Sequence, residues 1–157
     1  MPINRVVVNA SPLICLYRSG LLGLLPSLFK EIVVPELVVK EIMAKEEINL
    51  KLEKQIYKFA DVAIVPPVAS WDLGNGESAV LTFALKNPEH WAVIDDREAR
   101  RCAVSLGCRY TGTVGIIVLA KKKGIITSVN DSLEKLENAG LWLSETFVNE
   151  VCKKAGE

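Results

Sequence analysis

Four acidic side chains and one amide stand at places in this sequence where they could act together. Asp95 and Asp96 follow a short apolar run, and Asn9 follows another. Glu41 lies in a segment that we expect to be helical, and Glu77 lies where a glycine-bearing loop enters another helix. Two carboxylates about 4 Å apart repel each other by roughly 4 kcal/mol at an effective dielectric of 20. A divalent cation removes this conflict, and oxygen ligands favour Mg²⁺ or Mn²⁺ over Zn²⁺. Such an ion can activate water and stabilise charge on a phosphodiester.

Each of these residues also has a structural explanation that requires no metal. Asp95 could cap the next helix, because Glu98 stands at the capping-box position. Glu41 could form an ordinary surface pair with Lys45, four residues further on. A carboxylate such as Glu77 is favourable near a helix N-terminus without any function. Taken singly, therefore, none of these residues identifies a site.

The elements that would position these side chains alternate along the chain. Apolar runs predict strands at residues 5–8, 32–34, 62–65, 91–94 and 109–111. Helices are predicted at residues 12–19 (with Ser11 as N-cap and Pro12 in the first position), 21–29, 35–45, 49–60, 79–85, 97–106, 114–123, 130–138 and 144–154. This alternation predicts a three-layer α/β/α sandwich around a mostly parallel sheet of about five strands. Right-handed crossovers place the carboxyl ends of the strands at one edge, where we expect the polar residues to gather.

The composition fits one globular domain over residues 1–157. Half of the residues are hydrophobic, and 19 basic residues balance 19 acidic ones, which argues against disorder. The sequence has no apolar run long enough to span a membrane and no signal-peptide pattern, so we expect a cytoplasmic protein. The four cysteines form no C-x-x-C pair and there is one histidine, which argues against zinc and leaves a Cys102–Cys108 disulfide open.

Five segments, taken together, resemble the PIN-domain family, in an uncharacterised prokaryotic branch related to the toxins of toxin–antitoxin pairs. The segments are residues 6–14, 34–42, 74–79, 93–100 and 112–115, and they occur in the family's order. The resemblance spans about residues 5 to 126. It implies an α/β/α sandwich, a nuclease that uses Mg²⁺ or Mn²⁺ and acts on RNA, frequent homodimers, and often an antitoxin partner.

The resemblance also implies a site. Its acidic positions fall on Asn9, Glu41, Glu77 and Asp95, with Asp96 adjacent. We expect Glu41, Glu77, Asp95 and Asp96 to hold the metal, and Asn9 to orient the ion or a bridging water. The family usually has aspartate where this chain has Asn9. An amide oxygen can ligate a hard cation but brings no charge, so metal affinity should fall.

Four further residues are predicted to contact the RNA: Ser11, Arg97, Arg100 and Thr113. Ser11 matches the hydroxyl residue that follows the first acidic position of the family. The arginines, with Arg101, could contact backbone phosphates, although solvated helix charge is the simpler explanation.

We therefore predict a metal-dependent endoribonuclease that is the toxin of a toxin–antitoxin pair, without a membrane partner. Asn9 leaves an alternative open, which is a weak or inactive PIN-like module that binds RNA or a protein. A phosphoaccepting receiver domain fits less well, because its acidic pair follows the first strand, where this chain has only Asn9. A Rossmann dinucleotide domain lacks its G-x-G-x-x-G motif here.

Overall fold

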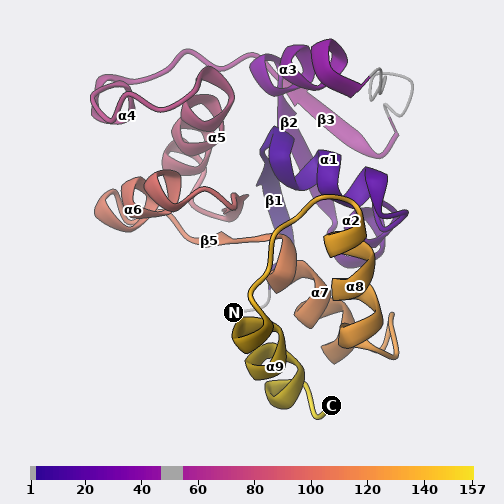
Figure 1. Cartoon of the computed structure of the whole chain (residues 1–157). Helices are drawn as coiled ribbons and strands as arrows, with labels where there is room; N and C mark the ends of the chain where they lie inside the picture. Colours follow the sequence, from indigo (N-terminus) through magenta and orange to yellow (C-terminus); the bar gives the residue numbers. More distant parts are fainter. Residues whose placement is uncertain (1–2, 47–54) are drawn as a thin grey trace.

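An all-parallel sheet forms the centre of the molecule in this computed structural model, which describes residues 3–46 and 55–157 (Figure 1). Within those residues the strand order is β3-β2-β1-β4-β5. The strands are β1 (Arg5–Val8), β2 (Glu31–Pro35), β3 (Tyr57–Ala60), β4 (His90–Val93) and β5 (Tyr110–Thr111). Val6, Val7 and Val8 of the central strand are 0% exposed, as expected of a parallel strand that helices cover on both faces.

Helices flank the sheet, so the predicted α/β/α fold is confirmed. Those of the described residues are α1 (Ala10–Arg18), α2 (Leu24–Leu28), α3 (Glu36–Glu46), α4 (Pro66–Ala69), α5 (Asn75–Lys86), α6 (Arg97–Ser105), α7 (Thr113–Lys122), α8 (Val129–Asn138) and α9 (Glu145–Lys154). In Figure 1, α5 and α6 lie on one side of the sheet and α1, α2 and α7 on the other. None of the helices in the described part of the chain has the length and apolar character needed to cross a membrane.

The third strand lies earlier in the chain than predicted. Residues 62–65 form no strand, and β3 is Tyr57–Ala60, which pairs with β2 from Ile32↔Tyr57 to Pro35↔Ala60. β3 is the edge of the sheet, where one side of the strand can face water. Its buried Tyr57 and exposed Lys58 fit that place better than a β-branched run. The predicted helix over 49–60 is wrong at residues 57–60, and its residues 49–54 lie outside the described part.

The first helix begins one residue earlier than its predicted cap. Ser11 lies inside α1, and Asn9 occupies the N-cap position without a side-chain capping bond. Pro12 is the third helical residue, where its missing N–H costs little because the first-turn N–H groups have no intrahelical acceptor. The Asn9 side chain therefore does not cap the helix and can contribute to a site instead.

The carboxyl ends of the parallel strands form one edge, as predicted. Asn9 follows β1 directly, and its backbone N–H donates to the Val93 carbonyl at the end of β4 (3.1 Å). Asp95 lies two residues after β4, and Gly112 follows β5. The sheet itself therefore brings Asn9 and Asp95 to this edge, whereas Glu41 and Glu77 are carried by α3 and α5.

Candidate functional site

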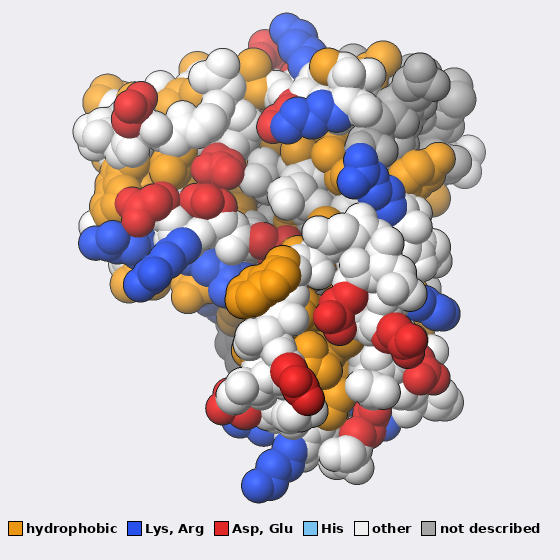
Figure 2. Space-filling view, in the orientation of Figure 1, with side chains coloured by type: hydrophobic (Ala, Val, Ile, Leu, Met, Phe, Trp, Pro, Cys, Tyr) orange, Lys and Arg blue, Asp and Glu red, His pale blue; other side chains and the backbone are white. Residues whose placement is uncertain are grey.

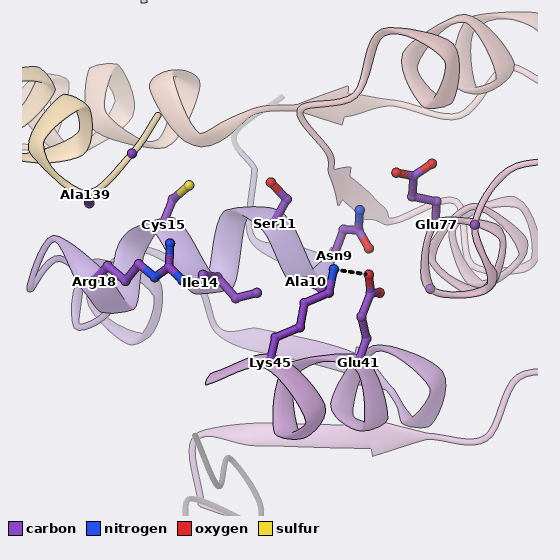
Figure 3. A pocket seen from close by; sticks show the side chains of 13 residues that line it. Asn9, Ala10, Ser11, Ile14, Cys15, Arg18, Glu41, Lys45, Glu77 and Ala139 are labelled. Atoms are coloured by element: carbon purple, nitrogen blue, oxygen red, sulfur yellow. Dashed lines mark hydrogen bonds and ion pairs between the residues drawn. The ribbon is translucent and has the colours of Figure 1, made fainter. Parts of the chain in front are cut away.

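A cavity of about 360 Å³ opens at this edge (Figure 3). Its walls come from α1, α3, the start of α5, and the connection that follows α8. The polar and ionisable side chains that line it are Asn9, Ser11, Cys15, Arg18, Glu41, Lys45 and Glu77. Three of the predicted site residues, Asn9, Glu41 and Glu77, thus share one cavity although they are far apart in the sequence.

Asn9 carries an unusual buried oxygen. The residue is 4% exposed, and among the described residues its Oδ1 atom has no hydrogen-bond partner. A buried acceptor without a partner costs about 1–3 kcal/mol. Such an atom in a native structure calls for an explanation, and an ion that the protein binds is one.

Gly76 shows where that oxygen points. A Cβ atom built on this glycine, in the first turn of α5, would lie 2.7 Å from Glu41 Oε2 and 3.4 Å from Asn9 Oδ1. The two oxygens therefore approach the same small space, which any side chain at position 76 would fill. Figure 3 shows the Asn9 and Glu41 side chains pointing toward each other, with Glu77 on a neighbouring helix.

Glu77 lies in a negative environment. Its pKa is raised from 4.5, first by burial, then by the charge of Asp96, and then by that of Glu41. Of the two adjacent aspartates that the sequence assigned to the metal, it is the charge of Asp96 that acts on Glu77. Asp96 is exposed and caps α6, since its Oδ2 accepts from the Ala99 N–H (3.0 Å). The sequence had assigned that cap, as one alternative, to Asp95.

Asp95 lies beside the cavity and is held firmly. Its Oδ1 accepts from the Thr113 N–H (2.8 Å) and its Oδ2 from the Thr113 hydroxyl (2.6 Å). Arg100 Nη2 is 3.7 Å from Oδ1. The carboxylate therefore sits at the N-terminus of α7, where the helix dipole favours it. Its charge reaches the cavity, because it is the second cause, after burial, of the raised pKa of Cys15.

The predicted RNA contacts divide into two groups. Ser11 and Arg97 are exposed, and Ser11 lines the cavity. Thr113 is 0% exposed and gives both its donors to Asp95, so it can act only by positioning that residue. Arg100 donates from Nε to the Ile94 carbonyl (3.1 Å) and lies over the Tyr110 ring (5.4 Å), which makes much of it structural.

Sequence reasoning missed several parts of the cavity. Lys45 Nζ lies 3.2 Å from Glu41 Oε1, so the expected surface pair is present and also lines the site. Arg18 lines it too, and Ala139 and Gly140 reach it from the connection after α8. The spacing of Glu41 and Lys45 was a usable signal. No local pattern marks residues 139–140, because they reach the cavity only through tertiary packing.

The donor set fits a small hard cation. Among the described residues, no three Asp, Glu, His or Cys side chains converge as a ready metal site. Mg²⁺, however, usually retains several waters and binds through one or two carboxylates. Asn9 Oδ1, Glu41 and Glu77 supply an all-oxygen set of that kind, and the orphaned amide oxygen is the observation that favours it.

A family model described as a PIN domain matches residues 5–157. The chain belongs to the PIN-domain family. No curated protein matches it. The PIN domain is a nuclease fold, often a ribonuclease, and PIN nucleases generally use divalent metal ions and act on RNA. The cavity of this PIN domain lies at the edge where an open parallel sheet carries its sites.

Proposed function

We propose that this PIN domain is an endoribonuclease that depends on Mg²⁺ or Mn²⁺ and hydrolyses RNA phosphodiester bonds. The observation that carries the proposal is the buried, unpartnered Asn9 Oδ1, which approaches the same space as Glu41 Oε2 over Gly76. Glu77 and Asp96 add negative charge beside it. A bound metal ion would supply an activated water and stabilise charge on the phosphodiester.

The residues of the chain divide the work. Asn9, Glu41 and Glu77 would hold the ion from the cavity, and Asp96 and Asp95 from the turn that enters α6. The two hydrogen bonds from Thr113 do not prevent this, because a carboxylate has about four lone-pair sites. They fix the Asp95 rotamer instead. Gly76 leaves space for the ion because it has no side chain.

The cavity also has two basic side chains in its lining. Arg18 and Lys45 line it, and Lys45 is exposed. In the proposed reaction these side chains neutralise the phosphate that approaches the carboxylates. Ser11, exposed at the mouth, donates or accepts a hydrogen bond with the RNA, and Arg97 contacts a backbone phosphate.

We further propose that the protein is the toxin of a toxin–antitoxin pair, acts as a homodimer and is held inactive by an antitoxin protein. This part rests on the resemblance of the five sequence segments to the toxin-related branch. The test mixes the purified protein and RNA with an antitoxin candidate encoded beside this chain and measures RNA cleavage by gel electrophoresis. Inhibition at a fixed stoichiometry is the expected result.

A second candidate function is a PIN module that binds RNA or a protein without cleaving it. Asn9 lacks the charge of the family's usual aspartate, and the Lys45 ammonium already pairs with Glu41 at 3.2 Å. Both features reduce the attraction of the cavity for a cation. Mn²⁺ binding separates the two candidates, since an inactive site binds the ion no better than a surface carboxylate does.

The test is cleavage of labelled mixed-sequence RNA by purified protein with Mn²⁺, Mg²⁺ or EDTA. Asp95→Asn and Glu41→Gln are prepared in parallel, with Glu134→Gln, on the exposed face of α8, as a matched charge control. Metal-dependent cleavage that both site variants lose and the control retains supports the nuclease. Cleavage that survives in both site variants points to a contaminant. If the unaltered protein is inactive, Asn9→Asp is the next variant, and restored cleavage would show that the amide has silenced a nuclease site.

A further inference from the structure

A groove runs along the outer face of α6, separate from the acidic cavity. Its volume is about 510 Å³. Five of its residues lie on α6 at positions 97, 100, 101, 104 and 105. This is the spacing of one helical face, and the opposite face of α6 is buried through residues 99, 102 and 103. Trp71 and Tyr110 close the groove from the segment after α4 and from β5.

The groove is positively charged. Its lining includes three arginines and no acidic residue. Figure 2 shows Lys and Arg side chains on this side of the molecule, with Asp and Glu side chains next to them. Arg97 is exposed and has no hydrogen-bond or ion-pair partner among the described residues. It is also the first residue of α6, where the helix dipole disfavours a cation. Local structure therefore does not account for this charge.

Arg101 is also available to a ligand. Its Nη1 atom pairs with Glu98 Oε1 at 3.1 Å, but both side chains are more than half exposed, so the pair contributes little. Arg100 differs, because it holds the Ile94 carbonyl and lies over Tyr110. Arg97 and Arg101 can thus bind an anion, whereas Arg100 is held by contacts within the protein.

The rest of the groove is apolar and aromatic. Val104 is 66% exposed, which is high for a valine, and the half-buried Trp71 and Tyr110 present their remaining surface to the groove. Single-stranded nucleic acids are bound by this combination of cations for phosphates and aromatic rings for bases. A duplex would not use the rings, because its base faces are already stacked.

We propose that this groove is a subsite for single-stranded RNA, in which Arg97 and Arg101 contact backbone phosphates and a base stacks on Trp71. The proposal rests on the proposed nuclease function and extends it. The groove begins beside the acidic site, since Arg97 at its start follows Asp96, which precedes the first turn of α6. From residue 97 to residue 105 it extends about 12 Å along the helix. We therefore place the single strand across the start of α6, between the acidic residues and the groove.

The first experiment measures binding without cleavage. Fluorescein-labelled oligouridine is titrated in EDTA, with fluorescence anisotropy as the readout, against the unaltered protein and Arg97→Ala/Arg101→Ala. Lys122→Ala/Lys123→Ala removes the same charge from exposed residues at the end of α7 and is the control. We expect the arginine variant to bind at least about tenfold more weakly, because even one hydrogen bond to a charged group contributes on that scale. The slope of log affinity against log salt should fall by about 1.4, or about 0.7 for each lost phosphate contact.

The second experiment tests the stacking contact. An abasic oligomer of the same length is compared with oligouridine on the unaltered protein, Trp71→Phe and Trp71→Ala. Stacking predicts tighter binding of oligouridine by the unaltered protein and by Trp71→Phe, and equal binding of both oligomers by Trp71→Ala. Because Trp71 also packs against the core, circular dichroism checks that the alanine variant is folded. The phenylalanine variant and the abasic oligomer still test the proposal if it is not.

Three results would overturn the proposal. Equal RNA affinity of the arginine variant and the lysine control would remove the phosphate contacts. Equal affinity of the unaltered protein for the two oligomers would remove the stacked base. A change of molecular mass by light scattering in the arginine variant, with unchanged RNA binding, would assign the groove to a second copy of the chain. Failure of the nuclease is distinguishable, because cleavage is measured with the metal and with Glu41→Gln, whereas RNA affinity is measured in EDTA, where no metal-dependent cleavage occurs.

Discussion

The two edges of the sheet treat their charges in opposite ways. At the edge where the strands begin, Glu31 of β2 contacts Lys58 Nζ (2.6 Å), the His90 ring and Arg5 Nε (3.9 Å). At the edge where they end, Asn9 Oδ1 has no partner among the described residues, and Glu77 lies near Glu41 and Asp96. The edge where the strands begin surrounds one carboxylate with basic side chains. The edge where they end brings several carboxylates together, of which Glu41 pairs with the exposed Lys45 and Asp95 with Arg100.

The pKa values of the two glutamates show the consequence. The pKa of Glu31 lies below 4.5, chiefly because of its hydrogen bond from Lys58 and then of that from His90. The pKa of Glu77 lies above 4.5, first because of burial. Folding thus gains from the first charge and is opposed by the second. Groups that oppose folding in a cavity are candidates for function, so substitutions at the two edges should have opposite effects.

The largest effect is expected for Glu41→Gln. Loss of a charged oxygen from the proposed metal set should lower Mn²⁺-dependent RNA cleavage at least about 100-fold. The unfolding free energy should change by less than about 0.5 kcal/mol, because the Lys45 pair is exposed. Single-turnover cleavage and urea unfolding measure the two quantities on the same preparation. Full activity in this variant would exclude Glu41 from the site.

The residues at the edge where the strands end could be predicted from the sequence, whereas those at the other edge could not. Asn9, Glu41, Glu77 and Asp95 were predicted to meet because strand ends in a parallel sheet share an edge, a rule that needs no side-chain coordinates. The sequence could not distinguish Asp95 from Asp96. That choice depends on the backbone turn between β4 and α6, which directs the Asp95 carboxylate to Thr113 and the Asp96 carboxylate to the Ala99 N–H.

The edge where the strands begin gave no signal in the sequence. Glu31, Lys58 and His90 come from three strands, and they meet only in the observed register, in which Arg5 is paired with Glu31 on one side and with His90 on the other. Predicting them required β3 at its true place. The β-branched run at 62–65 was preferred because strand propensity was weighed without knowing that β3 is an edge strand.

The next largest effect is a loss of stability at the edge where the strands begin. Glu31→Ala removes the partner of the His90 ring, which is 6% exposed and whose Nδ1 atom already lacks one within the described residues. A buried group left unsatisfied costs about 1–3 kcal/mol. Urea unfolding should show that loss at neutral pH, while metal-dependent cleavage below the melting temperature stays unchanged. Because the pKa of Glu31 is lowered by folding, the difference from the unaltered protein should shrink as the pH falls below 4.5. A loss of cleavage as great as that of Glu41→Gln would end the distinction between the edges.

The carboxylate of Glu157, like that of Glu31, is stabilised by donors around it, here at the N-terminus of α8. Its carboxylate accepts from the N–H groups of Val129 (2.7 Å) and Asn130 (3.1 Å) and pairs with Lys121 (3.1 Å). The two backbone bonds are the main reason that its pKa falls from 4.5 to about 2. A lowered pKa stabilises the fold above the unfolded value, and this contribution is lost as the pH falls from about 4.5 to about 2. Hydrogen exchange of the first-turn amides of α8 should be faster in Glu157→Gln at neutral pH and should converge with the unaltered protein near pH 2. Faster exchange that persists at the lowest pH would contradict this assignment.

The smallest effect, and the one of opposite sign, is expected for Glu77→Gln. Folding raises the pKa of Glu77, so the stability linked to its protonated form is present at low pH and is lost as the pH rises through the folded value. A neutral amide of the same size removes that cost. The variant should therefore be more stable than the unaltered protein in EDTA at neutral pH, by no more than about 1 kcal/mol because the group is partly screened by solvent. Urea unfolding at neutral pH and near pH 4, with and without Mn²⁺, measures this, and Glu134→Gln is the control. Mn²⁺ should stabilise the unaltered protein and reverse the order of the two, since binding to the folded state alone raises stability. A variant that is less stable than the control in EDTA would show that the Glu77 charge supports the fold, and the two edges would then no longer differ.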